Sequence, residues 1–179
     1  MGKKNPGWEG KTTKKWSQEL IDSLKLKPSD NIVMFNKPFD KGLVQENYRQ
    51  RPFFKPDGVW YACGSEWLEW TLYEMKDWLG DYIYRLDIDK SNFIMIRNEK
   101  MLFDFTEGYV LNNAGYSIIE NNTIDWPLVA KAGYQGIQIC PYLNTARMSS
   151  RAGWYYAWDV ASGCVWDTTC IKNVSIIEF

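Results

Sequence analysis

The segment from Gly58 to Trp78 constrains the fold of this chain more than any other. Its first five residues, Gly58 to Ala62, are small, apolar or aromatic and predict a short buried strand. After them Trp67, Trp70 or Thr71, Met75 and Trp78 recur three or four residues apart, a spacing that predicts a helix. A strand that presents a ring, followed by a helix with more rings, suits a flat heteroaromatic ligand such as nicotinamide or a base. Packing of the same rings in the core is the alternative.

Composition indicates a single domain without a dominant electrostatic field. The chain has 179 residues and a formal net charge of −1, so no overall charge attracts nucleic acid or an anionic membrane. Ten Trp and eleven Tyr are unusually many, and such rings suit interfaces and ligand platforms. Residues 1–15 carry five Lys against one Glu and predict a flexible basic lead-in, which leaves 16–179 as the domain.

The cysteine and histidine content excludes several kinds of chemistry. The four Cys have no CxxC spacing and the chain has no His, so we expect no structural zinc site and no metal cofactor. Acid–base chemistry would depend on carboxylates, Lys, Tyr or Cys. The sequence has no leader-like apolar segment at its start and no apolar run of membrane-spanning length. We therefore expect reduced thiols, no membrane partner and a cytoplasmic location.

The hydrophobic pattern along the chain predicts an α+β fold with mostly short strands. Strands are expected near residues 32–36, 58–62, 82–88, 93–96, 135–140, 163–166 and 174–178. Helices are expected near 17–26, from 65 to about 79, and from Asp125 to Gly133. Residues 37–56 and 141–153 have the composition of loops, and 99–124 show no clear pattern.

The order of these pieces resembles a known superfamily. Val33-Met34-Phe35-Asn36, Gly58-Val59-Trp60-Tyr61-Ala62 and Ser162-Gly163-Cys164-Val165-Trp166-Asp167 follow one another as do the signature strands of ADP-ribosyltransferases. The resemblance is to the diphtheria-toxin and poly-ADP-ribose-polymerase side, and to small phage-encoded members such as an anti-CRISPR ADP-ribosyltransferase. It covers roughly residues 31–179. It implies split antiparallel or mixed β-sheets around a cleft with flanking helices, and NAD as a substrate.

The resemblance also implies site residues, each of which departs from the family pattern. The family's His falls on Asn36, its stacking Tyr on Trp60 and its Glu on Ser162. Asn36 can still hydrogen-bond a ribose or carboxamide, and Trp60 can still stack. A hydroxyl at Ser162 cannot stabilise an oxocarbenium ion as a carboxylate does, so Asp159 is expected to supply the charge. The expected catalytic residues are therefore Asp159 and Ser162.

The helix after the Gly58 strand carries the remaining expected contacts. Trp67 or Trp70 would match the family's second stacking ring, and Ser65 would either contact nicotinamide or cap the helix. Arg147 and Arg151 could bind pyrophosphate, because the guanidinium fork matches phosphate oxygens. Solvation of the loop that carries them is the simpler alternative.

Three functions are considered, two that the resemblance implies and one from another class. The first is an NAD-dependent ADP-ribosyltransferase with a protein or nucleic-acid acceptor. Its similarity to phage members predicts a viral protein that acts on a host or defence component in the host cytoplasm. The second is a catalytically inactive protein of the same fold that binds a nucleotide or blocks a protein partner. The third, if the resemblance is accidental, is a carbohydrate- or nucleobase-binding module that uses its rings as platforms.

Overall fold

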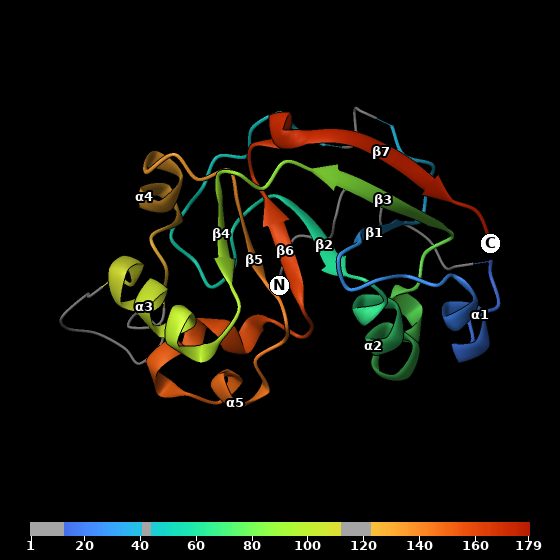
Figure 1. Cartoon of the computed structure of the whole chain (residues 1–179), viewed down its shortest axis with the longest axis horizontal. Coiled ribbons are helices and arrows are strands. Elements are labelled where there is room, and N and C mark those ends of the chain that lie inside the picture. The colour runs from blue at the N-terminus through green and yellow to red at the C-terminus, as the bar shows by residue number, and fades with distance from the viewer. Residues whose placement is uncertain (1–12, 41–43, 112–122) are drawn as a thin grey trace.

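The fold is built around one strongly curved mixed sheet (Figure 1). The structure, a computed structural model, describes residues 13–40, 44–111 and 123–179. Its strands are β1 (Asn31–Phe35), β2 (Val59–Cys63), β3 (Tyr82–Ile88), β4 (Phe93–Ile96), β5 (Gly136–Ile139), β6 (Ser162–Val165) and β7 (Ile171–Ile177). Their order is β4-β5-β6-β2-β1-β3-β7, and only β4 and β5 are parallel. The α+β class is thus confirmed. In the described residues, however, the strands form one continuous sheet and not two.

Short helices cover one face of this sheet in two groups (Figure 1). The first group is α1 (Gln18–Ser23) and α2 (Glu66–Glu74), followed by the 3-10 turn η2 (Lys76–Trp78). The second is α3 (Glu99–Tyr109), α4 (Trp126–Lys131), α5 (Asn144–Arg147) and the 3-10 segment η4 (Ser150–Ala157). A last 3-10 turn, η5 (Thr168–Cys170), precedes β7. None of the helices in the described ranges has the length and hydropathy needed to cross a bilayer.

Polar side chains begin three of the helices. Ser17 accepts a hydrogen bond from the Leu20 amide at α1, and Asp125 accepts one from the Leu128 amide at α4, as the sequence predicts. Asn98 does the same for α3, a helix that the sequence pattern left undefined. Gly133 ends the α4 region at φ +96°, a conformation that favours glycine.

Alternation along the strands separates the core into layers. Trp60 on β2 and Cys164 on β6 face the second helix group, whereas Tyr61 and Val165 face the concave side of the sheet. The core under the second group is dominated by large rings, among them fully buried Trp126, Trp154, Tyr155 and Trp158. The first group packs on the other end of the same face, against β1 and β3.

Gly163 on β6 allows a side chain to cross the concave face. It pairs with Tyr61 on one side and Gln138 on the other. The Tyr61 ring lies over Gly163, and its hydroxyl donates a 2.9 Å hydrogen bond to Gln138 Oε1. A Cβ on Gly163 would overlap that ring, so glycine is what permits this bridge across three strands.

The four cysteines are free thiols, as expected from the sequence. Of the predicted basic lead-in, residues 1–12 lie outside the described residues. Thr13 donates from its amide to Asp81 Oδ1 at 2.7 Å, and Lys14 Nζ donates to the Phe179 carbonyl at 3.2 Å. The start of the described chain is therefore tied to the loop before β3 and to the end of β7.

Candidate functional site

The strongest candidate site lies around Trp60, at the edge of the second helix group. The Trp60 ring centroid is 4.8 Å from that of Trp158, with an edge-on angle of 68°. Trp158 is 1% exposed, whereas Trp60 is only partly buried. The indole Nε1 of Trp158 is buried and has no hydrogen-bond partner among the described residues. Buried donors usually have a partner, so this indole is a polar group that the described residues leave unsatisfied.

Two cations and one carboxylate accompany these rings. Lys55 Nζ lies 5.1 Å from the Trp60 ring centroid, in cation–π geometry. Arg147 donates from Nη2 to Asp159 Oδ1 at 3.1 Å and lies over the Tyr156 ring at 5.1 Å. The Nε of Arg147 is buried and has no partner in the described part of the chain. Lys55, Trp60, Arg147, Trp158 and Asp159 together are called the Trp60 cluster.

Burial governs the electrostatics of this cluster. It lowers the pKa of Lys55, because an ammonium is costly in partly apolar surroundings, and Arg147 lowers it further while Asp159 raises it. No carboxylate in the three described ranges lies within ion-pair distance of Lys55. Tyr142 closes one side, donating a 2.8 Å hydrogen bond to the Trp158 carbonyl, and burial raises its pKa. The cluster therefore holds two positive charges against one negative charge.

Only part of the expected site is brought together. Asp159 follows Trp158 in sequence and so lies in the cluster with Trp60. Ser162 is opposite Ala62, two residues along from Trp60, but it is buried and its hydroxyl donates to the Val160 carbonyl at 2.9 Å. Its hydrogen bond is local, and nothing in its surroundings marks it as reactive.

Asn36 lies at the other end of the strands from Ser162. Asn31 is opposite Cys63, so the antiparallel register carries the end of β1 toward Val59 at the start of β2. Ser162 is level with the end of β2. The two residues are therefore separated along the strands by about 13 Å, at roughly 3.3 Å per residue. The structure does not bring Asn36 and Ser162 to one point.

The expected contacts on α2 have other partners. Ser65 occupies the N-cap position, but its hydroxyl donates to Glu69 Oε1 at 2.7 Å and caps no amide. Trp67 and Trp70 stack on each other with centroids 5.1 Å apart and an angle of 24°, and Trp78 packs against both. No ring contact within the described residues joins them to Trp60.

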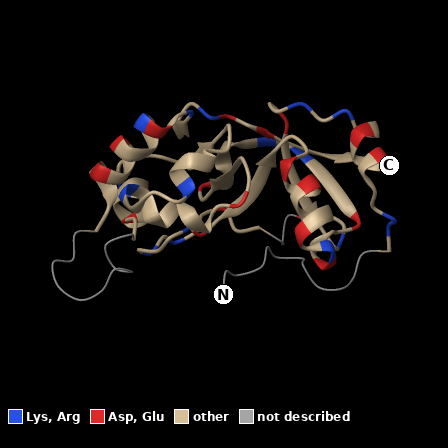
Figure 2. Cartoon of the chain, turned by 90° about the horizontal axis from the view of Figure 1, so that it is seen from below, with Lys and Arg blue, Asp and Glu red and all other residues tan. Residues whose placement is uncertain are grey.

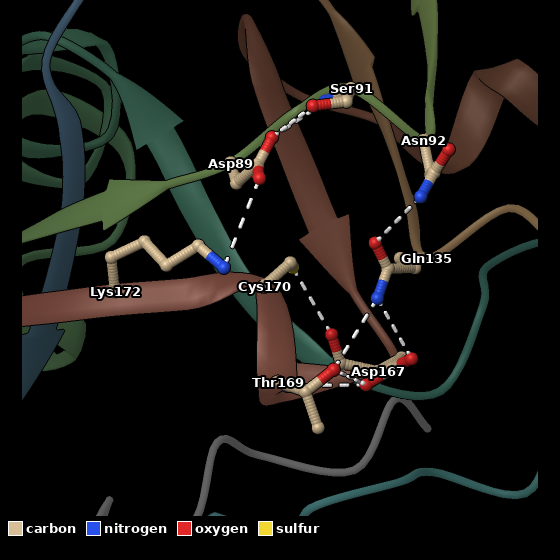
Figure 3. Close-up of polar contacts among 8 residues, drawn as sticks. All are labelled: Asp89, Ser91, Asn92, Gln135, Asp167, Thr169, Cys170 and Lys172. Carbon is tan, nitrogen blue, oxygen red and sulfur yellow. Dashed lines mark hydrogen bonds and ion pairs between the residues drawn. The ribbon is translucent and has the colours of Figure 1, made fainter.

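A second polar cluster, at the start of β5 and β7, serves the fold (Figure 3). Gln135 donates from Nε2 to Asp167 Oδ2 at 2.9 Å and accepts from Asn92 at 3.3 Å. Burial raises the pKa of Asp167, but hydrogen bonds from Thr169 and Gln135 outweigh it and the net pKa is lowered. Asp89 accepts from Ser91 in the same region. These side chains bond mainly to one another and hold the turns together.

Lys90 anchors a third network, on the concave face. Its ammonium donates to Asn31 Oδ1 at 2.6 Å and to Gln138 Oε1 at 2.5 Å, below the Tyr61 ring. Burial lowers the pKa of Lys90 and raises that of the Cys63 thiol. The amide oxygens already satisfy the ammonium, so the network cross-links the sheet.

Of the residues that the structure groups in the Trp60 cluster, the sequence analysis names Trp60, Asp159 and Arg147 but not Lys55 or Trp158. The signal for Lys55 was its place three residues before the Gly58 strand, where a loop returns toward the sheet. Trp158 is adjacent to Asp159 and could have been weighed with it. Arg151, the other expected pyrophosphate contact, is instead paired with Glu107 at 2.9 Å and lies over Phe103.

Searches against protein-family models, curated proteins and solved structures find no match to this chain. The fold and the Trp60 cluster therefore define it only as an α+β protein with a partly buried site of aromatic and cationic character. Its function has to be argued from the chemistry of that site.

Proposed function

We propose that this protein binds a nucleotide of the NAD type at the Trp60 cluster. The observation that carries the proposal is the Lys55 ammonium, held over the Trp60 ring with no carboxylate partner in the described residues. A phosphate group would take that position, and the partly exposed guanidinium of Arg147 would offer a second contact. The face of Trp60 would stack on a base or on nicotinamide.

The charge of the cluster favours an anion over a neutral ring. Two cations face a single carboxylate, and burial makes the ammonium of Lys55 costly in the free protein. A bound diphosphate would replace the solvation that Lys55 has lost, so its pKa rises on binding. A carbohydrate would offer no such compensation, which makes the nucleotide the better-matched ligand.

The resemblance to ADP-ribosyltransferases supports NAD among nucleotides, and transfer is the second candidate. In that chemistry the bond between nicotinamide and ribose breaks, nicotinamide leaves with the electron pair, and an acceptor nucleophile bonds to the ribose carbon. The observation that favours it is Asp159, whose carboxylate lies beside the rings and could face the ribosyl cation. Arg147 already offsets that charge, and Asn36 and Ser162 are far apart. Binding is therefore placed ahead of transfer.

Calorimetric titration tests the binding proposal, with ADP-ribose, NAD and nicotinamide as separate ligands. We expect ADP-ribose and NAD to bind and Lys55→Met to weaken both about 10- to 100-fold, the loss of one hydrogen bond to a charged group of about 1.5–3 kcal/mol. Lys131→Met is the matched control, because Lys131 is exposed at the end of α4 and carries the same charge. The proposal would be refuted if both variants bound the nucleotides with equal affinity. It would also be refuted if nicotinamide bound and neither NAD nor ADP-ribose did.

Incubation of NAD with the protein and a cell lysate tests transfer. The transferase candidate predicts free nicotinamide and a mass increment on a macromolecule, both lost in Asp159→Asn. Binding without either product leaves the nucleotide proposal in place and eliminates transfer.

A further inference from the structure

A groove in the described residues has none of the five residues of the Trp60 cluster in its lining. It has a volume of about 810 Å³ and runs between the segment before Gly58 and helix α4. Its lining consists of Asn47, Tyr48, Arg49, Gln50, Arg51, Pro52, Asp57, Pro127 and Ala130. Two arginines face one acid in this lining, so the groove is locally basic although the whole chain is not.

The segment that forms one wall has an unusual composition. From Tyr48 to Phe54 it contains two cations, three aromatic residues and no acid. Charged residues of both signs are otherwise spread over both halves of the chain (Figure 2). The net charge of −1 averages this segment with acidic stretches elsewhere. A local basic and aromatic run is the pattern of a surface that binds single-stranded nucleic acid.

The wall is held in one conformation by its own hydrogen bonds. The Gln50 side chain donates to the carbonyls of Tyr48 and Asp57, at 2.9 Å and 2.7 Å, and accepts from the Asp57 amide at 3.1 Å. The Tyr48 amide donates to the Trp166 carbonyl at 2.7 Å, which ties the segment to the end of β6. The flanking arginines are therefore carried on a fixed backbone, which reduces the ordering that a ligand must impose.

The two arginines differ in the ion pairs and ring contacts that they already make. Arg51 pairs with Asp57 at 3.1 Å and lies over the Phe53 ring at 5.0 Å. Arg49 has no ion pair or side-chain hydrogen bond within the described residues. Asp57 compensates only one of them, and a free guanidinium remains at the groove.

We propose that this groove binds single-stranded nucleic acid. Arg49 and Arg51 bind consecutive phosphates, since a guanidinium fork matches phosphate oxygens. The apolar surface of Tyr48, Pro52 and Pro127 receives a base from the strand. A duplex keeps its bases stacked inside and cannot use that surface, so a single strand is the better-matched ligand. This site is independent of nucleotide binding at the Trp60 cluster.

Fluorescence anisotropy with a labelled oligo-dT strand of about twelve nucleotides tests the proposal, over salt from about 50 to 200 mM. The affinity is expected to fall with salt. Arg49→Met should reduce the slope of log K against log salt by about 0.7, and Arg49→Met/Arg51→Met by about 1.4. Since Arg49 makes no ion pair or side-chain hydrogen bond in the described part of the chain, its variant should fold normally, and a circular-dichroism spectrum checks this.

The matched control is Lys76→Met/Lys100→Met, which removes two positive charges from exposed sites outside the groove. It should bind the strand within about two-fold of the parent protein, whereas the arginine double variant should bind at least about tenfold more weakly at the lowest salt. The proposal is overturned if both double variants lose affinity equally, if a duplex binds as tightly as the strand, or if the parent does not bind.

Discussion

Replacing Gly163 by Ala should destabilise the protein through a collision that can be located in advance. A Cβ at this position would lie 2.8 Å from the Ile137 carbonyl oxygen and still closer to the Tyr61 ring. The carbonyl belongs to the neighbouring strand and cannot move without distorting the pairing of β5 with β6. The ring could move only by giving up the Tyr61–Gln138 hydrogen bond.

The size of this effect follows from its parts. Overpacking costs about 1–3 kcal/mol and the lost hydrogen bond about 1 kcal/mol, while reduced freedom of the unfolded chain returns up to about 1 kcal/mol. The net loss is about 1–3 kcal/mol, which lowers the Tm by roughly 2–12 °C for a domain of this size. Differential scanning calorimetry and urea unfolding measure it.

Gly108→Ala is the matched control. Gly108 lies near the end of α3, and a Cβ there would meet nothing within 4 Å. The same substitution should therefore stabilise by about 0.5–1 kcal/mol. In Gly163→Ala, adding Tyr61→Leu should recover part of the loss, since the shorter side chain makes room. The reasoning would be refuted if the stability losses of Gly163→Ala and Tyr61→Leu simply added in the double variant. It would also be refuted if Gly163→Ala and Gly108→Ala changed the stability equally.

Two further predictions concern a helix cap and a buried thiol. Asn98→Ala should lower the free energy of unfolding by about 1 kcal/mol, because the Asn98 side chain caps α3. Ser65→Ala should lower it by less, because the Ser65 side chain caps no amide. Equal losses in urea unfolding would contradict this. Burial raises the pKa of Cys170 from 9.0 to about 11, so the folded state keeps its thiol protonated and stability is lost as pH rises above 9. The stability difference between the parent and Cys170→Ala should shrink by about 1 kcal/mol from pH 8 to pH 10, and a constant difference would contradict the assignment.

The secondary structure could be predicted well where the pattern was local. All seven strands overlap the alternating or apolar runs that predicted them, although β7 begins at Ile171, three residues before its expected start, and Ser17 and Asp125 cap helices as expected. Helix α3 was missed, although Asn98 and the spacing of Leu102, Phe105 and Thr106 in the buried face carried a signal. The segment expected as a loop from 141 to 153 contains α5 and the first half of η4, both too short for a periodic pattern.

The arrangement of these elements could not be predicted, since it depends on pairings between distant residues. The register that separates Asn36 from Ser162 is set by β1, β2 and β6 together, not by the sequence near either residue. The position of Lys55 over Trp60 depends likewise on how a loop returns to the sheet. Residue types suggested a site of rings and charge, but only the fold shows which of them meet.

Chemical shifts of the tryptophan indole groups test the central claim most directly. The ten tryptophans each give an indole N–H signal, and those of Trp16 and Trp126 already donate to carbonyls, at 3.1 Å and 3.0 Å. ADP-ribose added to the nitrogen-15-labelled protein should shift the signals of Trp60 and Trp158, while those of Trp16 and Trp126 stay in place. If the nucleotide leaves Trp60 and Trp158 unmoved, or moves all the indole signals alike, the Trp60 cluster is not a nucleotide site.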